Sequence, residues 1–218
     1  MDFEPFPKIP RLNREILVTE KLDGTNAAII IEDYGPTADP RIAAAIADDP
    51  QQVIVDRHIY GIGAQSRNRL ITPNNETNKQ ADNYGFAGWV ADHAAELVRL
   101  LGPGRHFGEW WGQGIARNYG LDHKRFSLFN ANRYDSAPFI NNGLVHVVPV
   151  LYRGSFSELQ IKLMVHNLRD FGSVAASGFD RPEGIIVYHT AARQSFKVTL
   201  EGDDAPKSAS IHWGNDDL

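Results

Sequence analysis

The stretch EILVTEKLDGTNAAIII, residues 15–31, places one lysine among acids at the end of an apolar run and then breaks the run with a glycine. Both ends are rich in β-branched residues, so we predict two strands around a tight bend at Gly24. Because side chains alternate along a strand, Lys21 and Asp23 would share one face and Glu20 the other. Taken alone, this pattern favours a structural ion pair beside a glycine turn. A lysine nucleophile is the alternative.

Short β-type segments separated by turn residues make up most of the remaining chain. Residues 3–13 contain three prolines and predict an extended arm. Residues 61–78 are rich in glycine, asparagine and proline and predict a loop. Further strands are predicted for residues 51–59, 105–111, 125–131, 144–152, 182–190 and 193–201.

Helical patterns are fewer. Residues 37–49 suit a short surface helix inserted into a hairpin, and residues 78–101 carry apolar side chains near helical spacing. A further helix opens with a capping box formed by Ser155 and Glu158 and closes at Gly172. Many strands with two or three helices predict an α+β domain of antiparallel sheets with flanking helices.

Length and composition narrow the class of protein. The 218 residues suffice for one domain with a substantial core, and the contents of 42% hydrophobic and 22% charged residues are those of a globular protein. The net charge of −5 argues against a surface that coats nucleic acid indiscriminately. The absence of cysteine excludes a disulfide scaffold, a thiol nucleophile and a thiolate zinc site. No segment resembles a signal peptide or a membrane span, so we expect a soluble, cytoplasmic protein without a membrane partner.

Five other polar residues stand where binding chemistry is plausible. Arg67 and Arg69 lie in a loop sequence, where guanidinium groups suit phosphate oxygens. Glu109 stands among aromatic residues, so we expect it to be partly buried and to need a partner. Glu183 precedes a glycine and an apolar strand, and Lys197 lies on the last predicted strand. Singly, each has a structural interpretation: an exposed arginine pair, an internally bonded carboxylate, a solvated turn acid and an edge-strand charge.

The order of these groups resembles the signature motifs of covalent nucleotidyltransferases, the superfamily of ATP-dependent DNA ligases, RNA ligases and mRNA capping enzymes. The matching segments are Lys21-Leu22-Asp23-Gly24, Ser66-Arg67-Asn68, Phe107-Gly108-Glu109, Phe126-x-x-Phe129, Glu183-Gly184 and Phe196-Lys197-Val198. The stretch EKLDGTN, followed by SRN and FGEWWG, is most similar to the RNA ligase branch. The resemblance runs from about residue 15 to 200. It implies an ATP-grasp-like ligase adenylation domain over residues 1–200, with a polar tail over 201–218 and no separate C-terminal domain.

The resemblance implies that Lys21 attacks the α-phosphorus of ATP, releases pyrophosphate and leaves a covalent lysyl-AMP. A free lysine has a pKa near 10.4, so nearby cations, a metal or burial must favour the neutral amine. Lys197 would act with it by neutralising the α-phosphate and the leaving pyrophosphate. Glu183 would hold Mg²⁺ or Mn²⁺ through oxygen coordination.

The resemblance also implies the residues that bind the nucleotide. Arg67 would contact the phosphate or ribose, and Glu109 would bind the ribose hydroxyls. Phe129 would stack on adenine, with Phe126 as the alternative. The other residues assigned to the nucleotide are Glu20, Asp23 and Gly24.

Two departures from the family pattern bear on function. Ligases commonly carry a second lysine two positions after the one that matches Lys197, and this chain has Thr199 there. Related enzymes also continue into a C-terminal domain that closes on the nucleotide or grips the polynucleotide. We therefore expect minimal apparatus for handling ends, or a partner subunit that replaces that domain.

These observations predict an ATP-dependent RNA ligase-like nucleotidyltransferase of phage or cellular origin, suited to RNA repair. It would transfer AMP to a 5′-phosphate end and seal that end to a 3′-hydroxyl, with RNA as the favoured acceptor. The alternatives are a ligase for DNA or hybrid nicks, another AMP transferase, or a non-catalytic module that binds nucleotides or ends. The sequence contains no paired-histidine zinc motif and no glycine-rich phosphate loop.

Overall fold

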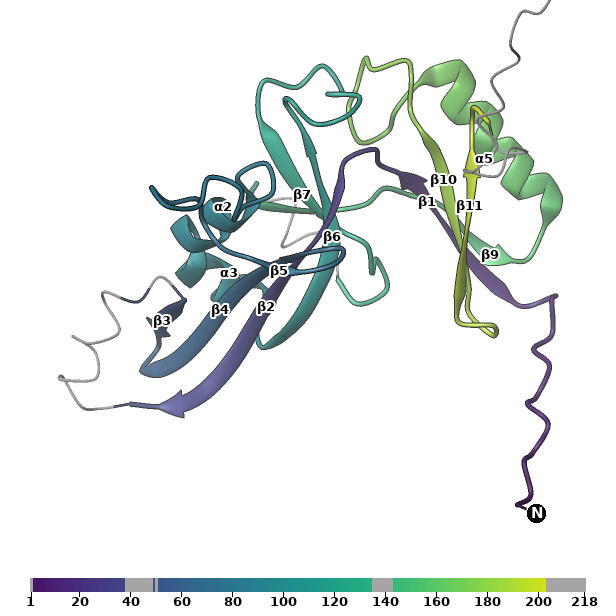
Figure 1. The fold of residues 1–218 in the computed structure, drawn as a ribbon. Coiled ribbons are helices and arrows are strands. Elements are labelled where there is room, and N and C mark those ends of the chain that lie inside the picture. Colours follow the sequence, from purple (N-terminus) through teal and green to yellow (C-terminus); the bar gives the residue numbers. More distant parts are fainter. Residues whose placement is uncertain (1, 38–48, 50, 135–142, 203–218) are drawn as a thin grey trace, which may run out of the picture. The chain divides into compact units, whose positions relative to one another are not determined.

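The chain folds into two compact units, each built on its own sheet (Figure 1). The first comprises residues 1–21 and 149–218, and the second comprises residues 22–148. The computed structural model describes residues 2–37, 49, 51–134 and 143–202. The helix predicted for residues 37–49 and the polar tail predicted for 201–218 therefore lie almost wholly outside the described residues.

The first unit is a four-stranded antiparallel sheet with one helix. The strand order is β11 (Gln194–Thr199), β10 (Gly184–His189), β1 (Glu15–Lys21) and β9 (Val150–Ser155). The helix α5 (Glu158–Phe171) packs on β9 and β10. The strands predicted for 182–190 and 193–201 are confirmed as β10 and β11, which pair along their whole length.

Alternation along β1 decides which side chains of the first unit face α5. Ile16 and Val18 are fully buried and form a core cluster with β10 side chains and with α5. Glu20 follows them on the same face, whereas Lys21 lies on the opposite face. The α5 face of the sheet is therefore the core, and the other face carries Lys21.

The second unit is a larger sheet with the strand order β3 (Gln52–Val55), β4 (His58–Ser66), β2 (Thr25–Pro36), β6 (Gly104–Gly112), β7 (Lys124–Leu128) and β8 (Val145–Val147). The short β5 (Leu70–Ile71) pairs with β4. All pairs are antiparallel except β7 with β8. The predicted fold class, α+β, is confirmed, and this parallel pair is its one departure from antiparallel pairing among the described residues.

One face of the larger sheet carries the core of the second unit. Ala27, Ile29 and Ile31 alternate toward α2 (Phe86–Asp92) and α3 (Ala94–Leu101), whose apolar side chains complete the cluster. Glu109 pairs with Asn26 in the β2–β6 register and so points to the opposite face. The helices cover one face of this sheet, and Glu109 lies on the other.

The two strands predicted around Gly24 are confirmed, but they do not form a hairpin. β1 pairs with β9 and β10, whereas β2 pairs with β4 and β6. The bend at residues 22–24 therefore passes the chain from one sheet to the other.

The helix predicted for residues 78–101 is shorter and divided. Tyr84 and Gly85 have φ values of 52° and 80°, in the left-handed region, so a helix cannot begin before Phe86. His93, with φ −111° and ψ 18°, then separates α2 from α3. These backbone angles explain why the apolar spacing overestimated the helix.

Three further predictions needed correction. Residues 51–59 are not one strand, because Asp56 and Arg57, with φ 50° and 67°, turn the chain between β3 and β4. The run at 144–152 is not one strand, because the chain changes sheet at Val148–Pro149: Val148 N–H bonds to Leu128, and the Pro149 carbonyl accepts from Glu20 N–H. Proline has no N–H with which to continue a ladder. The first part of the predicted loop at 61–78 is the end of β4. Gly61 lies within this strand because the Tyr34 side chain occupies the space that a Cβ at position 61 would need.

The cap of α5 also differs from the prediction. Ser155 belongs to β9, and Ser157 is the N-cap, its hydroxyl accepting a hydrogen bond from Gln160 N–H at 3.3 Å. The closing residue, Gly172, is as predicted. No helix in the described ranges is both long enough and apolar enough to cross a membrane.

Candidate active site

Lys21 ends β1 on the face of the first sheet opposite α5, which we call the open face because it carries no helix, although Leu17 and Thr19 on it are buried. Its ammonium group forms an ion pair with the Glu183 carboxylate, and the two side chains are 23% and 18% exposed. Lys21 pairs with Gly184 in the β1–β10 register, which brings the preceding Glu183 beside it. The predicted structural pair of Lys21 with Asp23 is therefore wrong, because residue 183 and not residue 23 supplies the carboxylate.

Lys197 shares the face that carries Lys21. Thr199 pairs with Gly184, and Gly184 pairs with Lys21, so Lys21 and Thr199 point to the same side of the sheet. Lys197 lies two residues before Thr199 on β11 and so points the same way. Its side chain is exposed, and within the described residues it has no hydrogen bond or ion pair. The sheet thus collects two amines and one carboxylate on its open face.

Glu20 does not face the nucleotide side that the resemblance assigns to it. Its side chain is 1% exposed and accepts hydrogen bonds from Ser173 Oγ at 2.6 Å and from the N–H groups of Val174 and Ala175, each at 2.9 Å. Burial raises the pKa of this carboxyl, and the three hydrogen bonds oppose that shift. Glu20 thus ties β1 to the loop after α5, directly before the candidate nucleophile.

Asp23 and Gly24 begin the second unit with contacts of their own. The Asp23 carboxylate accepts from Arg117 Nε at 3.0 Å, and its backbone N–H donates to Tyr119 Oη at 2.8 Å. Gly24 N–H donates to Glu109 Oε1 at 3.1 Å. The acid that would oppose deprotonation of Lys21 is therefore paired with an arginine.

Glu109 is half-buried and has a partner, as predicted from its aromatic surroundings. It lies on the face of the larger sheet opposite α2 and α3, two residues from Phe107, which is 45% exposed. Phe129 N–H donates to the Phe107 carbonyl at 3.0 Å, which extends the β6–β7 pairing and sets Phe129 opposite Phe107. Phe129 is 38% exposed, whereas Phe126 is fully buried against Phe86. Burial thus removes Phe126 as a stacking surface.

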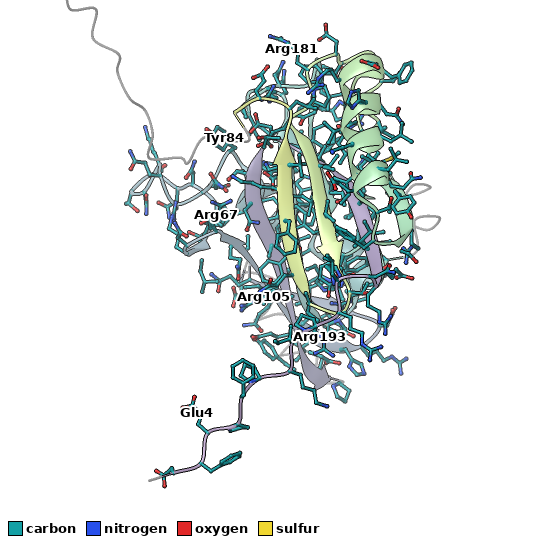
Figure 2. All side chains as sticks on the ribbon, turned by 90° about the vertical axis from the view of Figure 1, so that its right-hand side faces the viewer. Glu4, Arg67, Tyr84, Arg105, Arg181 and Arg193 are labelled. Carbon is teal, nitrogen blue, oxygen red and sulfur yellow. The ribbon has the colours of Figure 1, made fainter. Side chains whose placement is uncertain are left out.

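The two arginines of the SRNR loop have different surroundings. Arg69 donates to the carbonyls of Ala81 at 3.0 Å and Gln80 at 2.9 Å, so its guanidinium holds the following loop. Arg67 directly follows β4 and is exposed (labelled in Figure 2). Within the described part of the chain its side chain has no bonded partner. Arg67 is therefore the arginine that remains available to a phosphate.

The sequence interpretation missed Arg117, Tyr119 and Ser173. The first two lie in the glycine-rich segment after Glu109, where Ala116, Asn118 and Tyr119 all have positive φ. That compact turn brings Arg117 back to a residue 94 positions away. The sequence signal that could have identified them is a cation and a hydroxyl in a turn directly after the strand that carries Glu109. Nothing in the sequence linked Ser173 to Glu20.

The residues around Lys21 suit a divalent cation only in part. In residues 2–37, 49, 51–134 and 143–202 there is no group of three or more histidine, aspartate or glutamate side chains that could hold a metal. Glu183 bonds Lys21 through Oε2, and no described group bonds its other oxygen. Carboxylate oxygens are the ligands that Mg²⁺ and Mn²⁺ prefer. Glu183 therefore fits as one ligand, with phosphate oxygens as natural further ones.

Solved structures of an RNA ligase share the fold of this chain. The chain is similar to three variants of the Naegleria gruberi RNA ligase, each with a TM-score of 0.50. A lysine-to-methionine variant with AMP and Mn is 19% identical, an aspartate-to-alanine variant without ligand 18%, and a glutamate-to-alanine variant with ATP and Mn 17%. The matches cover 86%, 86% and 88% of this chain but 50%, 50% and 51% of the ligase chains. The chain thus spans about half the length of these ligases.

The comparison with curated proteins finds no match. The sequence profile described as RNA ligase matches residues 14–199, most of the chain and every motif residue considered above. The match includes both units and both candidate sets of residues. The chain therefore belongs to the RNA ligase family.

Proposed function

We propose that this chain is an ATP-dependent RNA ligase that forms a covalent lysyl-AMP at Lys21. The observation that carries the proposal is the open face of the first sheet, where Lys21, Glu183 and Lys197 lie on neighbouring strands. The family match supports the reaction class. The N. gruberi structures with ATP or AMP and Mn support the nucleotide and the metal.

In the proposed first step Lys21 Nζ loses a proton to solvent and its lone pair attacks the α-phosphorus of ATP. A nitrogen–phosphorus bond forms, the bond between the α-phosphorus and the bridging oxygen breaks, and pyrophosphate leaves with the bonding electrons. Lys197 offers a cation to the phosphates at this point. Mg²⁺ or Mn²⁺, held in part by Glu183, would supply positive charge that favours the neutral amine and stabilises the leaving group.

The proposed nucleotide contacts come from the second unit. Glu109 would accept hydrogen bonds from the ribose hydroxyls, Phe129 would stack on adenine, and Arg67 would contact phosphate or ribose. The half-burial of Glu109 and the exposure of Phe129 and Arg67 support these roles. Asp23 and Gly24 would hold the backbone around this set through their bonds to Arg117 and Glu109.

In the later steps AMP would pass to a 5′-phosphate, giving a phosphoanhydride, and a 3′-hydroxyl would displace AMP as the new phosphodiester forms. The family match favours RNA ends as the acceptor. We assign the first step to residues 1–200. Gripping the ends would then fall to these residues or to a partner subunit.

The first test is incubation with α-labelled ATP and Mg²⁺ or Mn²⁺, followed by a denaturing gel. We expect a labelled band that pyrophosphate reverses and that Lys21→Ala abolishes. Lys162→Ala is the matched control, because Lys162 is an exposed lysine on α5 whose ion pair with Glu158 is local. No band with either metal, from protein that is folded by circular dichroism, would exclude the enzyme and favour a non-catalytic binding module.

The acceptor is tested separately with the purified enzyme-AMP. We expect the label to move to 5′-phosphorylated RNA and not to the same RNA with a 5′-hydroxyl. Equal transfer to nicked DNA or to hybrid duplexes would show a broader ligase, and failure to transfer to any polynucleotide would indicate a different acceptor.

A further inference from the structure

The N-terminal arm, residues 2–14, precedes β1 and has every side chain exposed. Phe3, Phe6 and Ile9 are 89%, 84% and 81% exposed, the largest exposures of any large apolar side chain in the described ranges apart from Phe171, which is also 84% exposed. The arm forms no helix or strand and extends away from the sheet, with Glu4 near its tip (Figure 2). Isolated apolar side chains are common at surfaces, but three within seven residues are not.

The prolines in the arm restrict its backbone to an extended conformation. Pro5, Pro7 and Pro10 have φ fixed near −65°. The residue before each of them, namely Glu4, Phe6 and Ile9, is biased to the β or polyproline II region. Every residue from Glu4 to Pro10 except Lys8 is therefore restricted. The arm loses less conformational entropy on binding than a glycine- or serine-rich segment would.

The spacing of the side chains matches the three residues per turn of polyproline II. Phe3, Phe6 and Ile9 recur every third residue and so line one edge of such a helix, about 9 Å apart. Lys8 and Arg11 are also three apart and line a second edge. The arm therefore has an apolar edge beside an edge that carries Lys8 and Arg11, and its two acids, Asp2 and Glu4, lie toward its tip.

The root of the arm is fixed to the first unit. His189 Nε2 lies 2.7 Å from the Leu12 carbonyl, and Phe156 N–H donates to the Arg14 carbonyl at 2.8 Å. Residues 8–14 contain three cations, Lys8, Arg11 and Arg14, and no acid, in a chain with a net charge of −5. The basic part of the arm is thus the part held close to the sheet.

We propose that this arm binds the single-stranded polynucleotide on which the chain acts, with Lys8, Arg11 and Arg14 on phosphates and Phe6 stacked on a base. Proteins hold single strands without reading their sequence by combining cations on the phosphates with aromatic rings stacked on the bases. Charge complementarity to phosphate, and membership of the RNA ligase family, favour RNA over an aromatic-lined groove on a protein partner. The assignment of the strand as substrate rests on the proposed function.

The basic edge is tested by the salt dependence of binding. A fluorescent 5′-phosphorylated single-stranded RNA is titrated with the full chain and with the triple variant Lys8→Gln, Arg11→Gln, Arg14→Gln. Losing three phosphate contacts lowers the slope of log affinity against log salt by about 2. When the salt concentration is raised fourfold, the affinity of the unmodified chain should therefore fall by a factor about 15 times larger than the affinity of the variant does. The matched control replaces the exposed cations Lys162, Arg169 and Arg181 with glutamine, and its slope should not change.

The apolar edge is tested with Phe6→Ala. We expect about tenfold weaker RNA binding with an unchanged salt slope, because the loss is of stacking and not of charge. Phe171→Ala is the control, since Phe171 is also 84% exposed but ends α5. Unchanged affinity and slope in both arm variants would overturn the proposal and point to a protein partner. Equal losses in the arm variants and their controls would also overturn it.

These measurements do not depend on the lysyl-AMP. If the labelled band is absent but arm-dependent RNA binding is found, the proposed ligase reaction fails and the arm assignment stands. If the band forms normally in the arm variants while RNA binding does not respond to them, the arm assignment alone fails.

Discussion

Gly24 is the residue at which the candidate nucleophile motif makes its closest backbone contact. Its backbone is outside the left-handed region, so the need for glycine is steric and not conformational. A Cβ there would overlap the Trp110 carbonyl oxygen and would lie 2.7 Å from Trp111 Cβ. The same position lets Gly24 N–H reach Glu109. The absence of a side chain at Gly24 therefore lets the motif pack against β6, the strand that carries Glu109.

We expect Gly24→Ala to lower the free energy of unfolding by about 1–3 kcal/mol, since the neighbouring backbone must shift to accept the methyl group. Chemical denaturation followed by tryptophan fluorescence measures this change. Gly63→Ala in β4 is the control, because nothing lies within 4 Å of its added Cβ. It should be neutral or stabilising by about 0.4–1 kcal/mol. Equal destabilisation by both substitutions would contradict the steric argument.

At the scale of single elements, α5 shows how a sequence motif can mark the wrong residue. Ser155 with Glu158 fits the capping-box pattern, but Ser155 pairs with Glu15 in the β1–β9 ladder and is not at a helix end. Ser157, with extended backbone angles of φ −152° and ψ 115°, accepts the hydrogen bond from Gln160 N–H. Strand pairing thus determined where the helix begins.

The two serines give opposite expectations. Ser157→Ala should lower the free energy of unfolding by about 1 kcal/mol, because a first-turn N–H loses its acceptor. Ser155→Ala should change it by less than about 0.5 kcal/mol, as expected for an exposed strand residue. Urea denaturation of the two variants and the unmodified chain decides between the two caps. A larger destabilisation by Ser155→Ala would instead support the predicted capping box of Ser155 and Glu158.

Elements could be predicted from sequence where local pattern alone determines them. β1, β10 and β11 follow from their β-branched residues, and β6 from its aromatic ones. The helix start at Phe86 depends on positive φ at Tyr84, and the end of β8 depends on a change of sheet at Pro149, which local apolar spacing does not report. The order of the strands in each sheet is a long-range property and was not predicted.

The candidate site was predicted in part, for a related reason. Lys21, Glu109, Glu183 and Lys197 were identified because motif order marks them, but their partners come from distant positions. Glu183 is 162 residues from Lys21, and Arg117 is 94 from Asp23. For Glu20 the motif gave the wrong surroundings, because alternation turns it toward the core of the first unit. Motifs indicate which residues matter, and strand register decides which face each one occupies.

For the whole molecule, one buried and one partly buried histidine link stability to pH. His106 is fully buried, with Nδ1 2.7 Å from Tyr134 Oη and Nε2 2.9 Å from the Gly102 carbonyl. Burial holds the pKa of His106 below its ordinary value of 6.5, and the charge of Arg133 acts in the same direction. The pKa of His146 is lowered by burial and by Arg125 and His123. Both histidines are therefore neutral in the folded chain at pH values where the unfolded chain takes up protons.

The sign of the effect follows from proton counting. Between about pH 6.5 and the lower pKa values of the folded chain, the unfolded state binds more protons, so stability falls as the pH falls. The contribution is complete above about pH 6.5, and each histidine adds a slope of up to about 1.4 kcal/mol per pH unit below it. Denaturation at a series of pH values from neutral to mildly acidic should show this loss.

His106→Gln isolates one of the two contributions. The variant should be less stable at neutral pH because the buried contact with Tyr134 changes, but its stability should fall less steeply with acid, since one titrating group is gone. His166→Gln is the control, as His166 is exposed on α5 and should leave the slope unchanged. Glu20 has the opposite effect on stability. Its raised pKa makes the folded chain hold a proton more tightly, so above the ordinary pKa of this carboxyl the contribution of Glu20 to stability rises as the pH falls. That contribution is common to all three proteins, so an unchanged slope in His106→Gln would show that His106 is not the titrating group.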